Sequence, residues 1–382
     1  MYAFGLFFKP VMNEFNWSRG AISFAFTTLY LAQGIFQPVA GRFADRYGSR
    51  KVILVGAVIT GLGFSLLSLT RSLWHYYLLY SIVGIGLAAI GIVPVSLVIS
   101  NWFSQRRGIA LGIATTGVGV GGVVLSPVIG SYLIPSYGWH LSFLGLAVLS
   151  WLILIPLTLF VIKDKPELTT LPQTQGNAEA IELLPSDTGE WNLGMALKTS
   201  TFWFIVTGFL VANLSSIGIF QHQVNHFTDI GLSTAVAATS MSLVGLGSTF
   251  GKIGFGFLSD RLRPSYCAAI SFAFQAVAIV VLLYTKSMVL VGLYAILMGI
   301  GMGGWAPLVP QLVTTNFGTT SFGIILGMMR LAQNLGLIVG PLIAGYTYDT
   351  MGSYQWIFII YLALYAVAIP SILAARRPGV PS

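Results

Sequence analysis

Residues 41 to 51, GRFADRYGSRK, lie between two apolar stretches and set two glycines, an acid and a base at the spacing G-x-x-x-D-R-x-G. The motif residues are Gly41, Asp45, Arg46 and Gly48. Glycine lets two helices approach closely, and an aspartate can cap a helix N-terminus. Adjoining basic residues hold such a loop at an anionic membrane surface. The segment therefore predicts a tight connection between two membrane helices.

The same pattern returns later in the chain. GFLSD at 256–260 matches GRFAD at 41–45, an offset of 215 residues. GIILG at 323–327 matches GIALG at 108–112 at the same offset. Many transporter folds are built from internal repeats of this kind, with the substrate held between the halves. We therefore expect two related halves. The residues of the second motif copy are Gly256, Asp260 and Arg261.

The composition places the chain in a lipid bilayer. Of its 382 residues 55% are hydrophobic and 8% are charged, and the mean hydropathy is +0.84. A helix needs about 20 apolar residues to cross a membrane. Residues 1–12 are too short for that, so we interpret them as the outer end of a first helix that begins upstream. The eleven predicted spans are 21–41, 52–70, 75–99, 108–133, 141–162, 199–221, 234–258, 266–285, 287–312, 321–347 and 354–374.

Lysine and arginine residues gather on one side of this predicted topology, and basic loops are retained in the cytoplasm. The pattern predicts a multi-pass protein of the plasma (inner) membrane with a cytoplasmic C-terminus. The net charge of +8 follows from this topology and is not a nucleic-acid footprint. The predicted cytoplasmic residues are Arg42, Arg46, Arg50, Lys51, Arg106, Arg107, Lys163, Lys165, Lys198, Arg261, Arg263, Arg376 and Arg377.

The longest polar stretch, residues 163–198, is rich in proline, acids and small polar residues. This composition predicts a flexible cytoplasmic linker. The expected organisation is an N-terminal transmembrane half over 1–162, with a partial helix 1 and helices 2 to 6, followed by the linker. The C-terminal half over 199–382 would hold helices 7 to 12 and a short cytoplasmic tail.

With these motifs the whole chain resembles the major facilitator superfamily, which implies an all-α fold of two six-helix halves and an alternating-access mechanism. Three further strings resemble its monocarboxylate transporter and oxalate/formate antiporter branch: FGLFFKPVMNEFNWSRGAIS at 4–23, WFSQRRGIALGIATTGVGVGG at 102–122 and GPLIAGYTYDTMGSYQWIF at 340–358. The second resemblance implies a carboxylate substrate such as lactate, pyruvate, formate or oxalate.

Two basic residues are predicted deep in the membrane. Lys252 lies eight residues before Asp260, about 12 Å along its helix, and Arg330 lies about 15 Å from the same surface. A buried cation is costly and normally paired, yet all eleven acidic residues fall in predicted loops, helix ends or the linker. An anionic substrate would supply the missing charge. The alternatives are that Lys252 extends toward the cytoplasm and that Arg330 bonds Gln333 and Asn334.

The resemblance adds detail at both positions. The related families place an arginine on helix 8 where this chain has Lys252, and that arginine binds the substrate carboxylate. An ammonium lacks the planar fork of a guanidinium, so bidentate recognition is in question here. In the antiporter branch the helix 11 cation is a lysine about one turn after Arg330. Proton-coupled relatives carry an aspartate where this chain has Ser248, so the coupling mode stays open.

Two histidines, His222 and His226, share a helix face near the end of the predicted span 199–221. No third ligand is evident, so we expect capping and solvation in place of a metal site, with His222 as a possible gate or proton-handling residue. The single cysteine, Cys267, excludes an internal disulfide. We expect no metal, no cofactor and no enzymatic activity.

The sequence thus predicts a secondary active transporter for a small organic anion, a monocarboxylate above all, with the lipid bilayer and protons as further partners. Proton symport, anion exchange and facilitated diffusion all remain open. One alternative is an exporter of another small solute such as a drug, although cation carriers usually place acids in the membrane. A truncated chain with impaired transport is another, and a membrane sensor or enzyme ranks last.

Overall fold

The computed structural model describes residues 4–103, 105–164 and 191–379, and within these ranges the chain is helical, with turns and irregular segments between the helices. The helices are α1 (Phe4–Phe15), α2 (Arg19–Tyr47), α3 (Ser49–Leu67), α4 (Leu73–Ile90), α5 (Ile92–Trp102), α6 (Arg107–Pro127), the π-helix η1 (Val128–Leu133), α7 (Ile134–Phe160), α8 (Leu193–Leu197), α9 (Ser200–Asp229), α10 (Thr234–Ser259), α11 (Pro264–Leu283), α12 (Met288–Phe317), α13 (Phe322–Met351) and α14 (Gln355–Ala374).

Serine and threonine caps set where many of these helices begin. The side-chain oxygen of each cap accepts a hydrogen bond from the backbone N–H three residues later, which satisfies a donor that the first turn leaves free. Glycines with positive φ end α2 and α12, at Gly48 (φ 90°) and Gly318 (φ 74°). The caps are Ser18, Ser72, Thr199, Ser233 and Ser287, at the starts of α2, α4, α9, α10 and α12.

One predicted span is divided in the structure. The stretch 75–99 becomes α4 and α5, separated at Gly91, whose backbone is extended. Pro94, in the first turn of α5, has no N–H to donate to the carbonyl of Ile90, which suits a break at this point. A single helix of this length would therefore lack one of its hydrogen bonds at this point.

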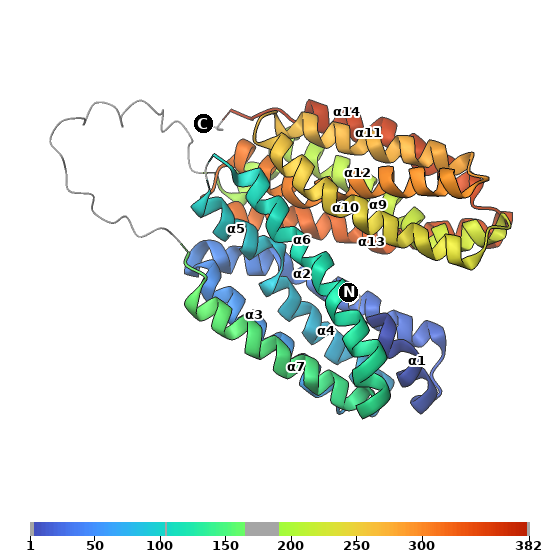
Figure 1. The fold of residues 1–382 in the computed structure, drawn as a ribbon. Coiled ribbons are helices and arrows are strands. Elements are labelled where there is room, and N and C mark those ends of the chain that lie inside the picture. The colour runs from blue at the N-terminus through green and yellow to red at the C-terminus, as the bar shows by residue number, and fades with distance from the viewer. Residues whose placement is uncertain (1–3, 104, 165–190, 380–382) are drawn as a thin grey trace.

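The helices form two groups that lie side by side (Figure 1). One group contains α1 to α7, coloured blue to green, and the other contains α9 to α14, coloured yellow-green to red. In the described part of the chain nine helical segments are long and apolar enough to cross a membrane. The predicted spans 21–41 and 108–133 are not among these nine. They form α2 and the continuous pair α6 and η1, and α2 and α6 pack against the other group.

The outer surface is apolar, as a membrane protein requires. Leu152 on α7 and Val289 on α12 expose 69% and 80% of their side chains, which would be unusual beside water and is normal beside lipid. Cys267 is buried on α11. The boundaries 1–162, 163–198 and 199–382 stay a prediction, and residues 165–190 of the expected linker lie outside the described residues.

Candidate functional site

The two groups of helices meet along two seams, one between α2 and α13 and one between α6 and α10. Each seam contains a crossing of two glycines. Gly41 of α2 lies against Gly323 of α13, and Gly256 of α10 lies against Gly108 of α6. A Cβ atom at any of the four would collide with a backbone carbonyl of the facing helix. The motif glycines therefore permit backbone contact between the groups.

An aspartate completes each crossing. The carboxylate of Asp45 accepts hydrogen bonds from the backbone N–H groups of Gly323 (2.7 Å) and Ile324 (2.9 Å), at the start of α13. Asp260 does the same at the start of α6, where Gly108 (2.6 Å) and Ile109 (3.0 Å) are the donors. A negative charge is favourable at a helix N-terminus, where free N–H groups and the helix dipole both point at it.

We call these two arrangements the Asp45 clasp (Gly41, Asp45, Gly323, Ile324) and the Asp260 clasp (Gly256, Asp260, Gly108, Ile109). Both lie at the end of the molecule that carries the basic motif loops, which we call the basic end. The two strings that repeat in the sequence are therefore partners in space, but crosswise. The aspartate of each repeat caps the GIxLG helix of the other repeat.

The seam between α6 and α10 contains two further contacts. Gln311 of α12 donates its Nε2 to Asp260 (3.1 Å). Lys252 of α10, which is partly buried, donates its Nζ to the backbone carbonyl of Thr115 on α6 (3.3 Å). Lys252 thus turns across the seam to the other group of helices. This contact differs from the alternative that the side chain extends freely toward the cytoplasm.

Arg330 lies on α13, in the other seam. Its Nη1 donates to Gln333 Oε1 (2.9 Å), one of the contacts considered above. Its Nε and Nη2 are buried and make no hydrogen bond in the described part of the protein. The same holds for Asn334 Nδ2, one turn further along, and for Gln37 Oε1 on α2. Buried polar groups are normally paired, so these atoms are candidates for contact with a polar ligand.

Gln37 is the residue that sequence reasoning missed, although a signal for it existed. Adding the repeat offset of 215 to Gln37 gives Lys252, and adding it to Thr115 gives Arg330. The contact between Lys252 and Thr115 therefore has a counterpart pair, Gln37 and Arg330, in the second seam. Gly327, one turn before Arg330, lies against the backbone of Gln37. By the repeat, Gln37 and Arg330 occupy the positions equivalent to Lys252 and Thr115, which are in direct contact.

Within the described ranges neither cation has an acidic partner. Among the described residues the carboxylate ion pair is Glu14 with His140 (3.6 Å), on a different part of the molecule from Lys252 and Arg330. The two cations lie on different seams, Lys252 with α6 and Arg330 with α2, and both belong to the second group of helices. An anion between the groups would therefore meet positive charge from one side.

The remaining motif residues make contacts within the basic end. The Arg46 guanidinium lies over the Tyr47 ring (5.2 Å to its centre), and that of Arg261 lies over Phe257 (4.1 Å). Gly48 has φ 90°, and a side chain there would collide with the carboxylate of Asp164, which accepts from the Arg50 N–H (2.9 Å).

The two histidines pack inside the second group of helices. Because α9 continues to Asp229, beyond the predicted end at residue 221, both lie on the helix and not beside a loop. His222 bonds the Tyr354 hydroxyl (3.1 Å) and the Pro341 carbonyl (3.0 Å). His226 is buried and its ring lies against Phe358. The expected solvation is thus wrong for His226.

Comparison with known proteins agrees with this architecture. The family model of the Major Facilitator Superfamily matches residues 1–335 and 227–382. Monocarboxylate transporter 13 of Bos taurus is 25% identical over 360 residues, covering 94% of this chain and 81% of the relative. The oxalate:formate antiporter of Oxalobacter formigenes is 27% identical over 279 residues, covering 73% of this chain and 63% of the relative.

A solved structure shows the same fold at greater sequence distance. The fucose:proton symporter FucP of E. coli superposes with a TM-score of 0.75 at 12% identity, over 99% of this chain and 96% of that one.

Proposed function

The chain belongs to the Major Facilitator Superfamily, and we propose that it carries a small organic anion, a monocarboxylate, across the membrane by alternating access. The observation that carries the proposal is Arg330, whose Nε and Nη2 are buried donors without a hydrogen-bond partner among the residues that the structure describes. A guanidinium presents such donors as a planar fork that matches a carboxylate. The monocarboxylate transporters and the oxalate:formate antiporter among the relatives support an anionic substrate.

The electrostatics support the same substrate class. A cation at mid-membrane depth costs about 2.5–3.5 kcal/mol on insertion scales. Arg330 offsets this cost with one hydrogen bond to a neutral amide, and Lys252 with one to a carbonyl. A bound carboxylate would add an opposite charge to both. A cationic or neutral solute would leave both charges uncompensated.

The clasps suggest how binding is linked to movement. In this structure the two groups are joined at the basic end by the Asp45 and Asp260 clasps, so access from that end requires both to separate. A carboxylate that draws Lys252 away from the Thr115 carbonyl removes one bond across the α6–α10 seam. Substrate binding would thereby weaken the closed basic end and favour rocking of one group against the other.

The orientation is part of the proposal. The basic end carries Arg42, Arg46, Arg50 and Lys51, and basic loops remain in the cytoplasm. We therefore place the basic end and the C-terminus in the cytoplasm. His222, which contacts the Pro341 carbonyl on α13 from α9, is proposed as a gate or proton-handling residue near the opposite end.

The test is uptake of labelled lactate, formate and oxalate into proteoliposomes under imposed pH gradients or with a counter-anion inside. We expect Arg330→Ala and Lys252→Ala each to lower uptake at least tenfold, equivalent to about 1.4 kcal/mol of lost interaction. Lys286→Gln, at an exposed lysine beyond α11, serves as the charge control and should leave uptake unchanged. Carboxylate uptake that survives in both alanine variants would refute the anion site.

A further inference from the structure

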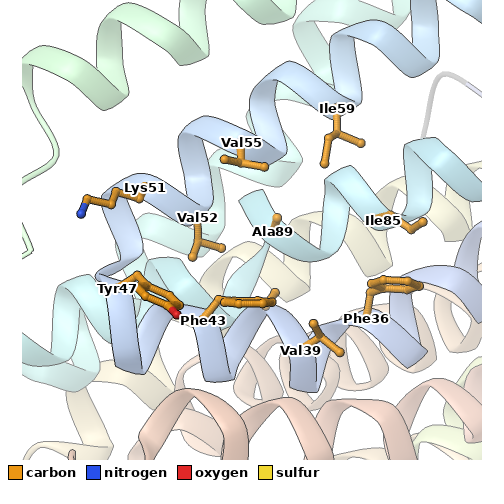
Figure 2. Close-up of a pocket in the computed structure, with 11 residues that line it drawn as sticks. Phe36, Val39, Phe43, Tyr47, Lys51, Val52, Val55, Ile59, Ile85 and Ala89 are labelled. Atoms are coloured by element: carbon orange, nitrogen blue, oxygen red, sulfur yellow. The ribbon is translucent and has the colours of Figure 1, made fainter.

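A concave site lies on the outer surface of the first group of helices, away from both seams. It is a cavity of about 540 Å³ between α2, α3 and α4, which we call the α2–α4 groove (Figure 2). Its walls are apolar, and Figure 2 shows their side chains converging from the three helices. They include Phe36, Val39, Phe43, Val55, Ile59 and Ile85.

The groove opens to the surroundings of the protein. Phe43 and Val55 expose 49% and 57% of their side chains, although both are large and apolar. On α2 the groove residues are spaced at 36, 39, 43 and 47, one helical stripe, whereas Gly34, Gly41 and Asp45 lie against α13. One face of α2 therefore serves the seam and another faces the bilayer.

The length of the groove matches one leaflet. From Phe36 to Tyr47 the wall of α2 rises about 16 Å at 1.5 Å per residue. Half of a hydrocarbon core is about 15 Å deep. A lipid acyl chain has this reach, and a transmembrane helix of a partner would extend through both leaflets.

Positive charge lies at one end of the groove. Lys51 lines it at the basic end, and Figure 2 shows its ammonium beyond the apolar side chains, on the side of Tyr47. Arg46 adds a second cation against the Tyr47 ring. Two carboxylates near this end, Asp45 and Asp164, both accept hydrogen bonds from backbone N–H groups. The charge at the rim therefore suits the phosphate of an anionic headgroup.

We propose that the α2–α4 groove binds an anionic phospholipid of the leaflet at the basic end, with an acyl chain along α2 and the phosphate at Lys51. The bound lipid covers the face of α2 opposite the Asp45 clasp. It contacts neither Lys252 nor Arg330, so the site is separate from the anion pathway.

The test measures bound lipid on the purified full chain by native mass spectrometry, with phosphatidylglycerol and phosphatidylcholine of equal acyl composition as the probes. Val55→Trp fills the groove, and Val148→Trp on α7 is its control, because Val148 is equally exposed (59%) on a different face. Lys51→Gln removes the positive charge that faces the lipid headgroup without altering packing, and Lys286→Gln is its control.

The wild type should retain phosphatidylglycerol in preference to phosphatidylcholine. Lys51→Gln should lower that preference about fivefold, the contribution of one basic residue at a membrane surface. Val55→Trp should remove the retained lipid, and both controls should match the wild type. Equal retention of the two lipids by the wild type, or a preference unaffected by Lys51→Gln, would overturn the proposal. So would a dimer that Val55→Trp dissociates, because the groove would then hold a second copy.

Discussion

The seam between α2 and α13 and the seam between α6 and α10 share one backbone plan and differ in their charges. Each has a crossing of two glycines and an aspartate that accepts from two N–H groups of the facing helix. In the α6–α10 seam the cation, Lys252, lies on α10, the helix that provides the aspartate. In the α2–α13 seam the cation, Arg330, lies on α13, the helix whose N-terminus the aspartate caps.

This difference separates two tasks. The clasps depend on backbone geometry and recur in both repeats, because the two seams of the pseudo-symmetric molecule close at the basic end in the same way. The cations do not recur: the repeat partner of Lys252 is Gln37, and that of Arg330 is Thr115. Two cations on one group of helices, facing neutral partners on the other, form the asymmetric surface at which we propose that an anion binds. The repeat thus supplies the frame, and departures from the repeat supply the proposed site.

The largest expected effect comes from blocking a glycine crossing. Gly41→Val or Gly256→Val would push a side chain into a facing carbonyl, and overpacking of this kind costs about 3 kcal/mol. The basic end should separate in either variant. Spin labels at Lys51→Cys and Arg263→Cys, in a Cys267→Ala background, would report the separation by pulsed electron resonance.

Gly254→Val provides the control on α10, because a side chain there meets open space. If Gly254→Val opened the basic end as far as Gly256→Val does, backbone contact could not be the reason for the motif glycine.

The next effect comes from neutralising a clasp. Asp45→Asn and Asp260→Asn each weaken two charge-assisted hydrogen bonds, at about 2 kcal/mol per variant. The shift toward the open basic end should be larger for Asp45→Asn than for Asp260→Asn. In Asp260→Asn the α6–α10 seam still keeps the contact between Lys252 and Thr115. The same spin-label pair measures both shifts. Asp349→Asn, at an exposed position near the end of α13, should have no effect. A larger shift in Asp260→Asn would reverse the ranking of the seams.

Exchanging the two kinds of cation tests their roles. Arg330→Lys removes the planar fork while keeping the charge, so the Kd for substrate should rise about tenfold, or 1.4 kcal/mol. Lys252→Arg keeps the charge and adds donors, so its Kd should stay equal or fall. Binding of lactate to the purified protein, measured calorimetrically, distinguishes the two, with Lys286→Arg as the control. The idea of a fork at Arg330 fails if Arg330→Lys binds as well as the wild type.

The smallest effect concerns Gln311, which donates to Asp260. Gln311→Ala removes one hydrogen bond to a charged group and should favour opening by about 1 kcal/mol. Its repeat partner, 215 residues earlier, is Ser96, whose buried hydroxyl has no partner in the described part of the chain. Ser96→Ala should therefore be close to neutral. Equal shifts in the two variants would show that Gln311 acts through packing and not through Asp260.

Much of the fold was predictable from local sequence. The apolar stretches and the motif loop depend on residues close together in the chain, the repeat can be read from the sequence itself, and the structure is helical over each predicted span, with a break in the span 75–99. The break at Gly91 and the extension of α9 to Asp229 were missed, because helix ends depend on individual caps and backbone angles. The roles of Lys252, Arg330 and His222 remain proposals, since burial shows where a charge lies and transport experiments show what it binds.

The sequence by itself determined that this protein belongs in a bilayer, that it contains two related halves, and that an aspartate and a glycine recur at a 215-residue offset. Only the tertiary structure decided that the repeats interlock crosswise, with Asp45 at residues 323 and 324 and Asp260 at residues 108 and 109. It also placed Gln37 beside the helix of Arg330. The physical reason is separation along the chain. The length of an apolar stretch and the charge of a loop are properties of neighbouring residues, whereas the clasps join residues 151 to 279 positions apart.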